Sequence, residues 1–189
     1  MLREFQYDDY KLFSSVFSNE KIMEYAYMDC ITDENKMKEY FNKVLNNCDT
    51  MENKNSYEFA VFTSTDEVFI GFADIEIKYH GAKVKSGEIG YFLLPDYWGK
   101  GYATEIAKRL IELCFNELKM PKVVASCNSN NFSSENVMKK VGMVKEGEFR
   151  KERYKNGKWD NELRYGILIE EWNKVSELCT TLMSSNTYM

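Results

Sequence analysis

The chain has 189 residues, enough for one domain or a small pair, and its 44% hydrophobic and 29% charged residues favour a packed core over disorder. Its 30 acidic residues outnumber 25 basic ones, and the net charge of −5 argues against a general nucleic-acid binder. The single histidine, His80, excludes zinc sites and catalytic triads that need several imidazoles.

The cysteine pattern and the absence of long apolar runs both favour a cytoplasmic protein. Five cysteines, an odd number without C-x-x-C spacing, predict reduced thiols. The N-terminus lacks a basic region followed by an apolar stretch, and no run of about 18 apolar residues occurs, so we expect neither a signal peptide nor a membrane span. Without a repeat or linker, residues 1–189 are expected to form a single cytoplasmic domain.

The first part of the chain predicts a strand, then helices, then strands. Residues 1–6 fit a short strand, and helical spacing follows to about residue 48, with Thr32-Asp33 as an N-cap region. Residues 49–56 are polar and predict a loop. Aromatic and β-branched residues then predict three strands, at 57–62, 68–78 and 88–94.

The second part predicts further alternation of helices and strands. An apolar stripe from Ala103 to Cys114 predicts an amphipathic helix that begins at Gly101. The pattern then predicts, in order, a strand at 122–127, a helix opened by Ser133-Ser134, strands at 144–153 and 159–169, and a last helix near Glu170. Asn156-Gly157 between the last two strands is a strong hairpin signal. The whole order predicts a mixed α/β (α+β) layer fold.

The segment from Gly87 to Thr104, GEIGYFLLPDYWGKGYAT, carries the clearest chemical signal. It is an apolar strand, a glycine-rich turn and the start of a helix, whose free backbone N–H groups favour anions. Gly99 and Gly101 would let phosphate oxygens approach the backbone, beside the cationic Lys100. The segment matches neither G-x-x-x-x-G-K-[ST] nor G-x-G-x-x-G. On these residues alone, a phosphate site and an ordinary turn are about equally good interpretations.

Two motifs nevertheless resemble one family. The run YWGKGYATE at residues 97–105 resembles the acetyl-CoA pyrophosphate loop, R/Q-x-x-G-x-G/A, of the GNAT superfamily of N-acetyltransferases. The resemblance is closest to the RimJ/RimL branch of ribosomal-protein N-terminal acetyltransferases, in which Trp98 is a common replacement for Arg or Gln. Residues 131–134 and 140–143 are similar to the family's N-x-x-S…K-L-G-F segment, at the right distance. Specific matches cover about residues 87–172.

This resemblance implies a mostly antiparallel sheet, flanked by helices, whose fourth and fifth strands splay apart around acetyl-CoA. The pantetheine arm would pair with the backbone of Phe92, Leu93 and Leu94, and Gly90 would mark a bulge or the point of splaying. Further coenzyme contacts are implied at Trp98, Gly99, Lys100, Gly101, Tyr102, Ala103, Thr104, Asn131 and Lys140. Core packing, helix capping and a solvated lysine are the ordinary alternatives for these side chains.

Acetyl transfer needs a neutral amine, so a base or a water relay must remove its proton. The resemblance places Glu88 as the candidate base, and a surface glutamate at a strand end is an equally good interpretation. Ser134 would lie near the thiol and could protonate it, because Met138 occupies the position where many relatives carry an acidic tyrosine; unassisted departure of the thiolate is the alternative. Acceptor contacts are expected from Asp74, Tyr154, Trp159 and Asp160, with Glu76 as a further candidate.

We therefore expect an acetyl-CoA-dependent N-acetyltransferase whose acceptor is a primary amine, on a protein N-terminus or a small molecule, attacking directly in a ternary complex. A polyamine or aminoglycoside acceptor is the alternative within enzymes, because an acidic chain attracts cations. From another class, the chain could be a catalytically idle acyl-CoA-binding module. A nucleotide binder ranks lower, since no Mg²⁺-binding pattern occurs. No metal, nucleic-acid or membrane partner is expected, and the chain would be a monomer or homodimer.

Overall fold

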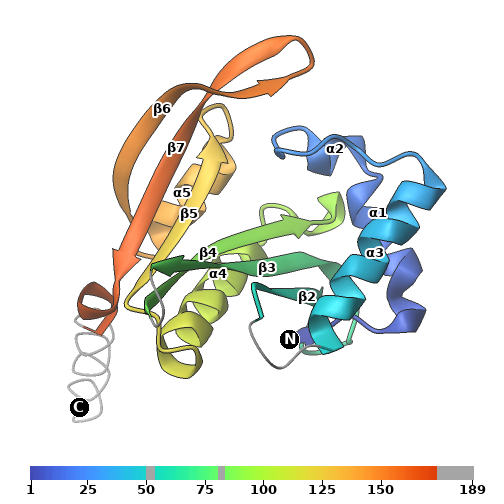
Figure 1. The fold of residues 1–189 in the computed structure, drawn as a ribbon, viewed down its shortest axis with the longest axis horizontal. Coiled ribbons are helices and arrows are strands. Elements are labelled where there is room, and N and C mark those ends of the chain that lie inside the picture. The colour runs from blue at the N-terminus through green and yellow to red at the C-terminus, as the bar shows by residue number, and fades with distance from the viewer. Residues whose placement is uncertain (50–53, 81–83, 174–189) are drawn as a thin grey trace, which may run out of the picture.

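One seven-stranded sheet organises the computed structural model, which describes residues 1–49, 54–80 and 84–173. The strand order is β1-β2-β3-β4-β5-β7-β6 (Figure 1). Neighbouring strands are antiparallel except β4 and β5, which are parallel. The sheet is flanked by helices, and the predicted mixed fold with a mostly antiparallel sheet is confirmed.

The N-terminal region contains one strand and a series of helices, as predicted. The elements are β1 (Leu2–Glu4), the 3-10 turn η1 (Tyr7–Asp9), α1 (Tyr10–Phe17), α2 (Glu20–Met23) and α3 (Glu34–Asp49). The backbone N–H of Lys36 donates to Asp33 Oδ1 at 2.8 Å, which confirms the predicted capping region. Residues 50–53 of the predicted loop lie outside the described residues.

The rest of the chain also follows the predicted order. Its elements are β2 (Ser56–Phe62), β3 (Phe69–His80), β4 (Val84–Leu93), η2 (Pro95–Tyr97), α4 (Tyr102–Glu112) with its π-helical continuation η3 (Leu113–Glu117), β5 (Lys122–Asn128), α5 (Phe132–Lys140), β6 (Val144–Lys155) and β7 (Lys158–Leu168). Residues 169–173 are helical, as expected near Glu170. Asn156 and Gly157 have φ of 51° and 75°, the conformation that an Asn-Gly hairpin turn needs. In the described ranges, no helix is both long and apolar enough to cross a membrane.

Two apolar clusters cover opposite faces of the sheet. On one face, Ala73 and Ile75 of β3 pack in the same cluster as Leu110 of α4. Most of the predicted stripe is buried there, and Ala103 and Leu113 are half-buried. On the other face, Phe72 packs with Phe13 and further aromatic residues of α1 and α3. Because side chains alternate along a strand, the residues that share a face with Phe72 point away from α4.

The predicted splaying of the fourth and fifth strands is confirmed. β4 and β5 are in register at only two positions, Gly87 with Val123 and Glu88 with Val124. Beyond Glu88, β4 stays paired with β3 while β5 pairs with β7, so the two parallel strands separate (Figure 1). The register of β3 with β4 runs unshifted past Gly90, so this glycine is not a bulge; it lies two residues beyond the last β4–β5 pair.

Candidate active site

The glycine-rich turn opens α4 as the sequence predicts. Gly101 is the N-cap of α4 with φ of 90°, and Gly99 has φ of 72°, both in the left-handed region that favours glycine. A Cβ placed on either glycine would meet no atom within 4 Å, so the space above the turn is open. No side chain caps α4, and the first helical amides, those of Tyr102 and Ala103, are not used within the helix. This arrangement suits an anionic group.

Trp98 fastens this turn to the end of β4. Its indole Nε1 donates to the Leu93 carbonyl oxygen at 2.7 Å, although the ring is 48% exposed. The Leu94 backbone N–H donates to the Ile70 carbonyl at 2.9 Å. Lys100 is exposed, with Nζ 5.5 Å from the centre of the Tyr97 ring. Phe92, Leu93 and Leu94 all pack in the apolar clusters, so their side chains also fill the core role that we considered.

Across the splay, Asn131 caps α5 and Ser134 lies opposite β4. Asn131 Oδ1 accepts from the Ser134 backbone N–H at 3.0 Å, which leaves the Asn131 amide nitrogen to donate elsewhere. The Ser134 hydroxyl lies 3.3 Å from the Tyr91 hydroxyl. Burial raises the pKa of Tyr91 to about 12, so this phenol stays protonated. Sequence reasoning missed Tyr91, since nothing local shows that its side chain reaches α5.

The other α5 positions of interest have simpler surroundings. Met138, at the position of the family's tyrosine, is buried in the apolar core. Lys140 is exposed on the last turn of α5. Cys127 is buried near Ser134, and burial raises the pKa of its thiol to about 11.

Four acidic residues form a carboxylate row on the sheet face that points away from α4: Glu58, Asp74, Glu76 and Glu88. Glu58 of β2 is directly opposite Asp74 of β3, and Glu76 of β3 is directly opposite Glu88 of β4. On its other side Asp74 faces Gly90. Glu58 was not singled out by sequence, since its neighbours in the row depend on strand register.

The members of the carboxylate row differ in their partners. Glu88 forms an ion pair with Lys78 on the neighbouring strand. Glu58 is buried; its Oε1 accepts from Ser56 Oγ at 2.7 Å and Asn47 Nδ2 at 3.2 Å. No described residue donates to Asp74. Burial, reinforced by the negative charges of Glu58, Glu76 and Glu88, raises the pKa of the Asp74 carboxyl to about 7.

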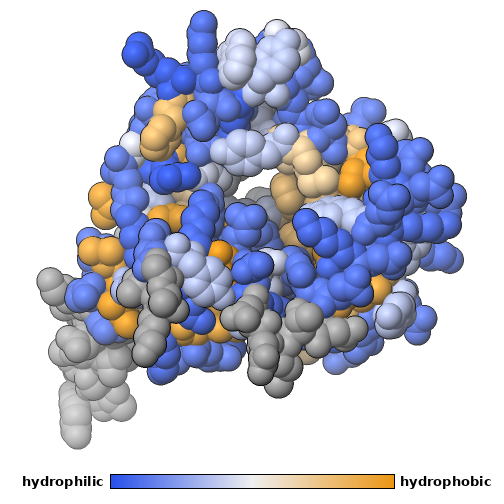
Figure 2. All heavy atoms as spheres, viewed as in Figure 1, coloured by the Kyte–Doolittle hydropathy of each residue, from blue (hydrophilic) through white to orange (hydrophobic). Residues whose placement is uncertain are grey.

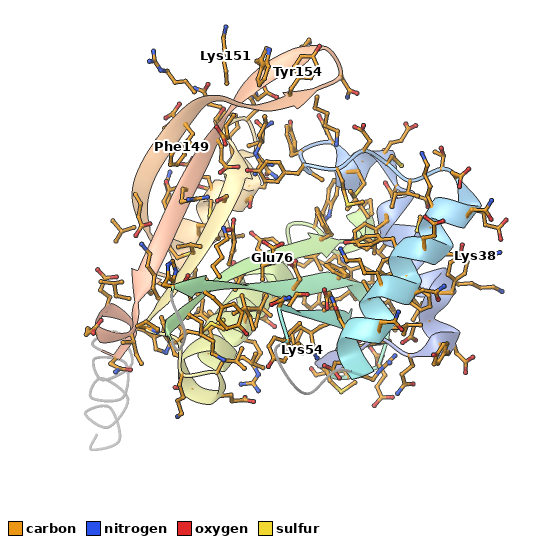
Figure 3. All side chains as sticks on the ribbon, viewed as in Figure 1. Lys38, Lys54, Glu76, Phe149, Lys151 and Tyr154 are labelled. Atoms are coloured by element: carbon orange, nitrogen blue, oxygen red, sulfur yellow. The ribbon has the colours of Figure 1, made fainter. Side chains whose placement is uncertain are left out.

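The hairpin of β6 and β7 docks against the segment after α2 and closes the space above the row. Lys155 Nζ donates to the carbonyls of Met23, Ala26 and Met28 at 2.5, 3.1 and 2.8 Å. Arg153, ion-paired with buried Glu162 at 3.1 Å, donates to the Tyr25 carbonyl at 3.0 Å. Figure 2 shows the molecule hollowed at its centre, between this hairpin and the sheet. In Figure 3, Glu76 points from β3 toward this hollow.

The remaining predicted acceptor residues are divided between two places. Asp160 is half-buried and accepts from Asn128 Nδ2 at 2.9 Å and Asn130 Nδ2 at 3.0 Å. Tyr154 lies near the exposed hairpin tip (Figure 3). The ring centres of Tyr154 and Trp159 are 4.9 Å apart. Asp160 therefore lies beside Asn128 and Asn130, whereas Tyr154 and Trp159 lie at the hairpin tip. The fourth predicted acceptor residue, Asp74, belongs to the carboxylate row. Among the described residues, no group of three or more His, Cys, Asp or Glu side chains is arranged to hold a metal ion.

Comparison with known proteins identifies similar sequences and folds. Residues 1–144 match the family model of the acetyltransferase (GNAT) domain. The uncharacterized N-acetyltransferase YnaD of Bacillus subtilis (strain 168) is 35% identical over 173 residues, which cover 92% of this chain and 95% of that protein. A spermidine N(1)-acetyltransferase of Vibrio cholerae is 24% identical over 177 residues, covering 93% and 96%.

Solved structures agree with these sequence matches. A GNAT-family acetyltransferase from Bacillus anthracis has a TM-score of 0.75 and 30% identity, covering 89% of this chain and 94% of that one. The V. cholerae spermidine N-acetyltransferase in complex with CoA and spermine has a TM-score of 0.79 at 22% identity, covering 91% and 96%, and shares the fold.

Proposed function

The chain belongs to the GNAT family of N-acetyltransferases, and we propose that it transfers the acetyl group of acetyl-CoA to a small, positively charged primary amine. The observation that carries the choice of acceptor is the carboxylate row beside the point where β4 and β5 separate. The row places four carboxylates on one face of the sheet, and only Glu88 is ion-paired to a described cation. This concentration of negative charge favours a cationic ligand.

The residues around the splay fit the coenzyme. The open turn at Gly99 and Gly101 and the free amides at the start of α4 suit its pyrophosphate. Asn131 has an amide nitrogen free to donate to the pantetheine arm, which would lie along β4 near Phe92 to Leu94. Lys100 and Lys140 are exposed cations that could meet its phosphates.

In the proposed reaction the amine nitrogen attacks the thioester carbonyl carbon directly within a ternary complex. The new C–N bond forms as the C–S bond breaks, the amine gives up two protons, and the departing thiolate takes up one of them. Ser134, backed by Tyr91, would supply a hydroxyl near the sulfur. Glu88 and Asp74 are the two carboxylates of the row nearest the splay that could take the other proton.

Two further observations support a small acceptor over a protein N-terminus. The hairpin contacts of Arg153 and Lys155 close the hollow on the side of α2, which favours a small acceptor. The V. cholerae relative is named for spermidine, a small polyamine. Two observations favour the second candidate, an acyl-CoA-binding module without turnover. The candidate base Glu88 is ion-paired with Lys78, and the buried Met138 stands where many relatives carry an acidic tyrosine.

A panel assay separates these candidates. Purified chain and acetyl-CoA are incubated with spermidine, spermine, diaminopropane, an aminoglycoside and peptides with free N-termini, and free CoA thiol is measured. Release with the polyamines but not the peptides supports the proposal, and the reverse order assigns a protein N-terminus. Tight CoA binding by calorimetry, with no release above background for any amine, would establish the idle module.

A further inference from the structure

We propose that Asp74 is the residue that takes the proton from the acceptor amine, in a position that Gly90 keeps open for it. This inference rests on the proposed function, because it assigns a role within the same acetyl-transfer site. It replaces Glu88, the candidate base that the family resemblance indicated, by a residue on the neighbouring strand.

Asp74 lies at the point where β4 and β5 begin to separate. Asp74 and Gly90 are directly opposite each other on β3 and β4, and Gly90 lies two residues past the last β4–β5 pair. A Cβ built on Gly90 would collide with Asp74 Oδ1, so the carboxylate lies over the glycine at the place where the strands separate. Any residue larger than glycine at 90 would displace the carboxylate from this position.

Asp74 has no competing partner among the residues that the structure describes. Lys78 forms its ion pair with Glu88, and no described residue donates a hydrogen bond to Asp74. The charged and titratable groups that face Asp74 are Glu58 of β2, Glu76 of β3, Glu88 of β4 and Tyr40 of α3. The three glutamates repel its ionised form, and Tyr40 is a half-buried phenol whose pKa is raised by desolvation. An incoming ammonium group is therefore the partner that this carboxylate lacks.

The proton affinity of the Asp74 carboxylate also suits this role. An unshifted aspartate, with a pKa near 3.8, is a poor acceptor for an ammonium proton with a pKa of about 10. Asp74, with its pKa raised to about 7, is closer to the amine and still ionised in about half of the molecules at neutral pH. In the transfer, one ammonium proton passes to Asp74 and on to solvent, and the second passes to the leaving thiolate, so that amide, free CoA thiol and one proton result.

The test is the pH dependence of kcat and KM for the most active amine of the panel. For wild type we expect kcat/KM to rise with pH through about 7, where Asp74 becomes ionised. Asp74→Asn should lower kcat about 100-fold or more, abolish this rise and leave the Kd for CoA unchanged. Glu76→Gln, which removes one negative neighbour of Asp74, should move the rise of kcat/KM to lower pH.

Two further variants keep the test decisive. Gly90→Ala retains the carboxylate but displaces it, so kcat should fall while CoA binding and cooperative unfolding persist. Asp66→Asn, at an exposed carboxylate in the turn between β2 and β3, is the matched control and should behave as wild type. A rise of kcat/KM near pH 7 that persists in Asp74→Asn, or a change in KM alone, would overturn the role of Asp74. Failure of the wild type to acetylate any amine would overturn the proposed function as well.

Discussion

The hydroxyls of Tyr91 on β4 and Ser134 on α5 lie 3.3 Å apart, a contact that spans the splay between β4 and β5. Tyr91 is held protonated by a pKa of about 12, so it can keep the Ser134 hydroxyl oriented throughout the neutral pH range. The pair lies on the side of the splay where the family resemblance predicts the coenzyme sulfur.

Ser134→Ala is expected to lower kcat about 10-fold or more and leave the Kd for CoA within twofold, because only the leaving thiolate loses its donor. Tyr91→Phe should produce a smaller loss in the same direction. Steady-state kinetics and calorimetric CoA titration measure these effects. A wild-type kcat in Ser134→Ala would show that the thiolate leaves unassisted.

Gly101→Asp should weaken CoA binding by about 100-fold or more, because it places a carboxylate where the turn would receive phosphates. Gly157→Asp is the matched control, since Gly157 also has positive φ and open space above it but lies in the hairpin turn. Both variants should lose about 1 kcal/mol of stability from the strained backbone. Equal CoA affinities for the two variants, measured by calorimetry, would remove the coenzyme role of the α4 turn.

Trp98→Phe removes the indole donor to the Leu93 carbonyl and is expected to cost about 1 kcal/mol of unfolding free energy. Because this bond fixes the turn to β4, the Kd for CoA should rise several-fold. Trp159→Phe, at a similarly exposed ring on the hairpin, should leave the Kd for CoA unchanged. Denaturant titration and calorimetry test both effects, and an unchanged Kd in Trp98→Phe would contradict the anchoring role.

Lys155→Met should free the end of α2 and the segment after it, because the ammonium donates to the carbonyls of Met23, Ala26 and Met28. We expect a loss of about 2 kcal/mol, faster amide exchange around Tyr25 and Ala26, and a KM increase for the amine that exceeds the increase for acetyl-CoA. Lys158→Met, at an exposed lysine across the hairpin turn, serves as the control. Matching exchange rates in the two variants would show that the hairpin contact does not order this segment.

Asp74→Asn should make the protein more stable at pH 8. The pKa of Asp74 rises from 3.8 to about 7 on folding, so between these values the folded chain holds a proton that the unfolded chain has released. The free energy of unfolding therefore falls as pH increases through this range, and the loss is complete above pH 7. The Tm of Asp74→Asn should exceed the wild-type Tm at pH 8 and converge with it near pH 4. A lower Tm for the variant at pH 8 would contradict this account.

The sequence by itself determined the helices and strands and the glycine-rich turn that opens α4, because their signals are local. Asp33 caps α3 by accepting a hydrogen bond from the backbone of Lys36, only three residues away. Asn156 and Gly157 form a tight hairpin turn that involves four consecutive residues. The glycines that open α4 combine with the apolar stripe of the same helix. Such signals depend on the backbone preferences of neighbouring residues and do not require knowledge of the rest of the fold.

Only the tertiary structure decided which acidic side chains meet. The register of β2, β3 and β4 places Asp74 between Glu58 and Gly90. It also brings Lys78 close enough to Glu88 to form an ion pair. A slip of one residue would turn each of these side chains to the opposite face, and no local pattern fixes that register. The carboxylate row, like the contact between Tyr91 and Ser134, thus depends on pairings between distant segments, whereas the acidic composition alone indicated only an attraction for cations.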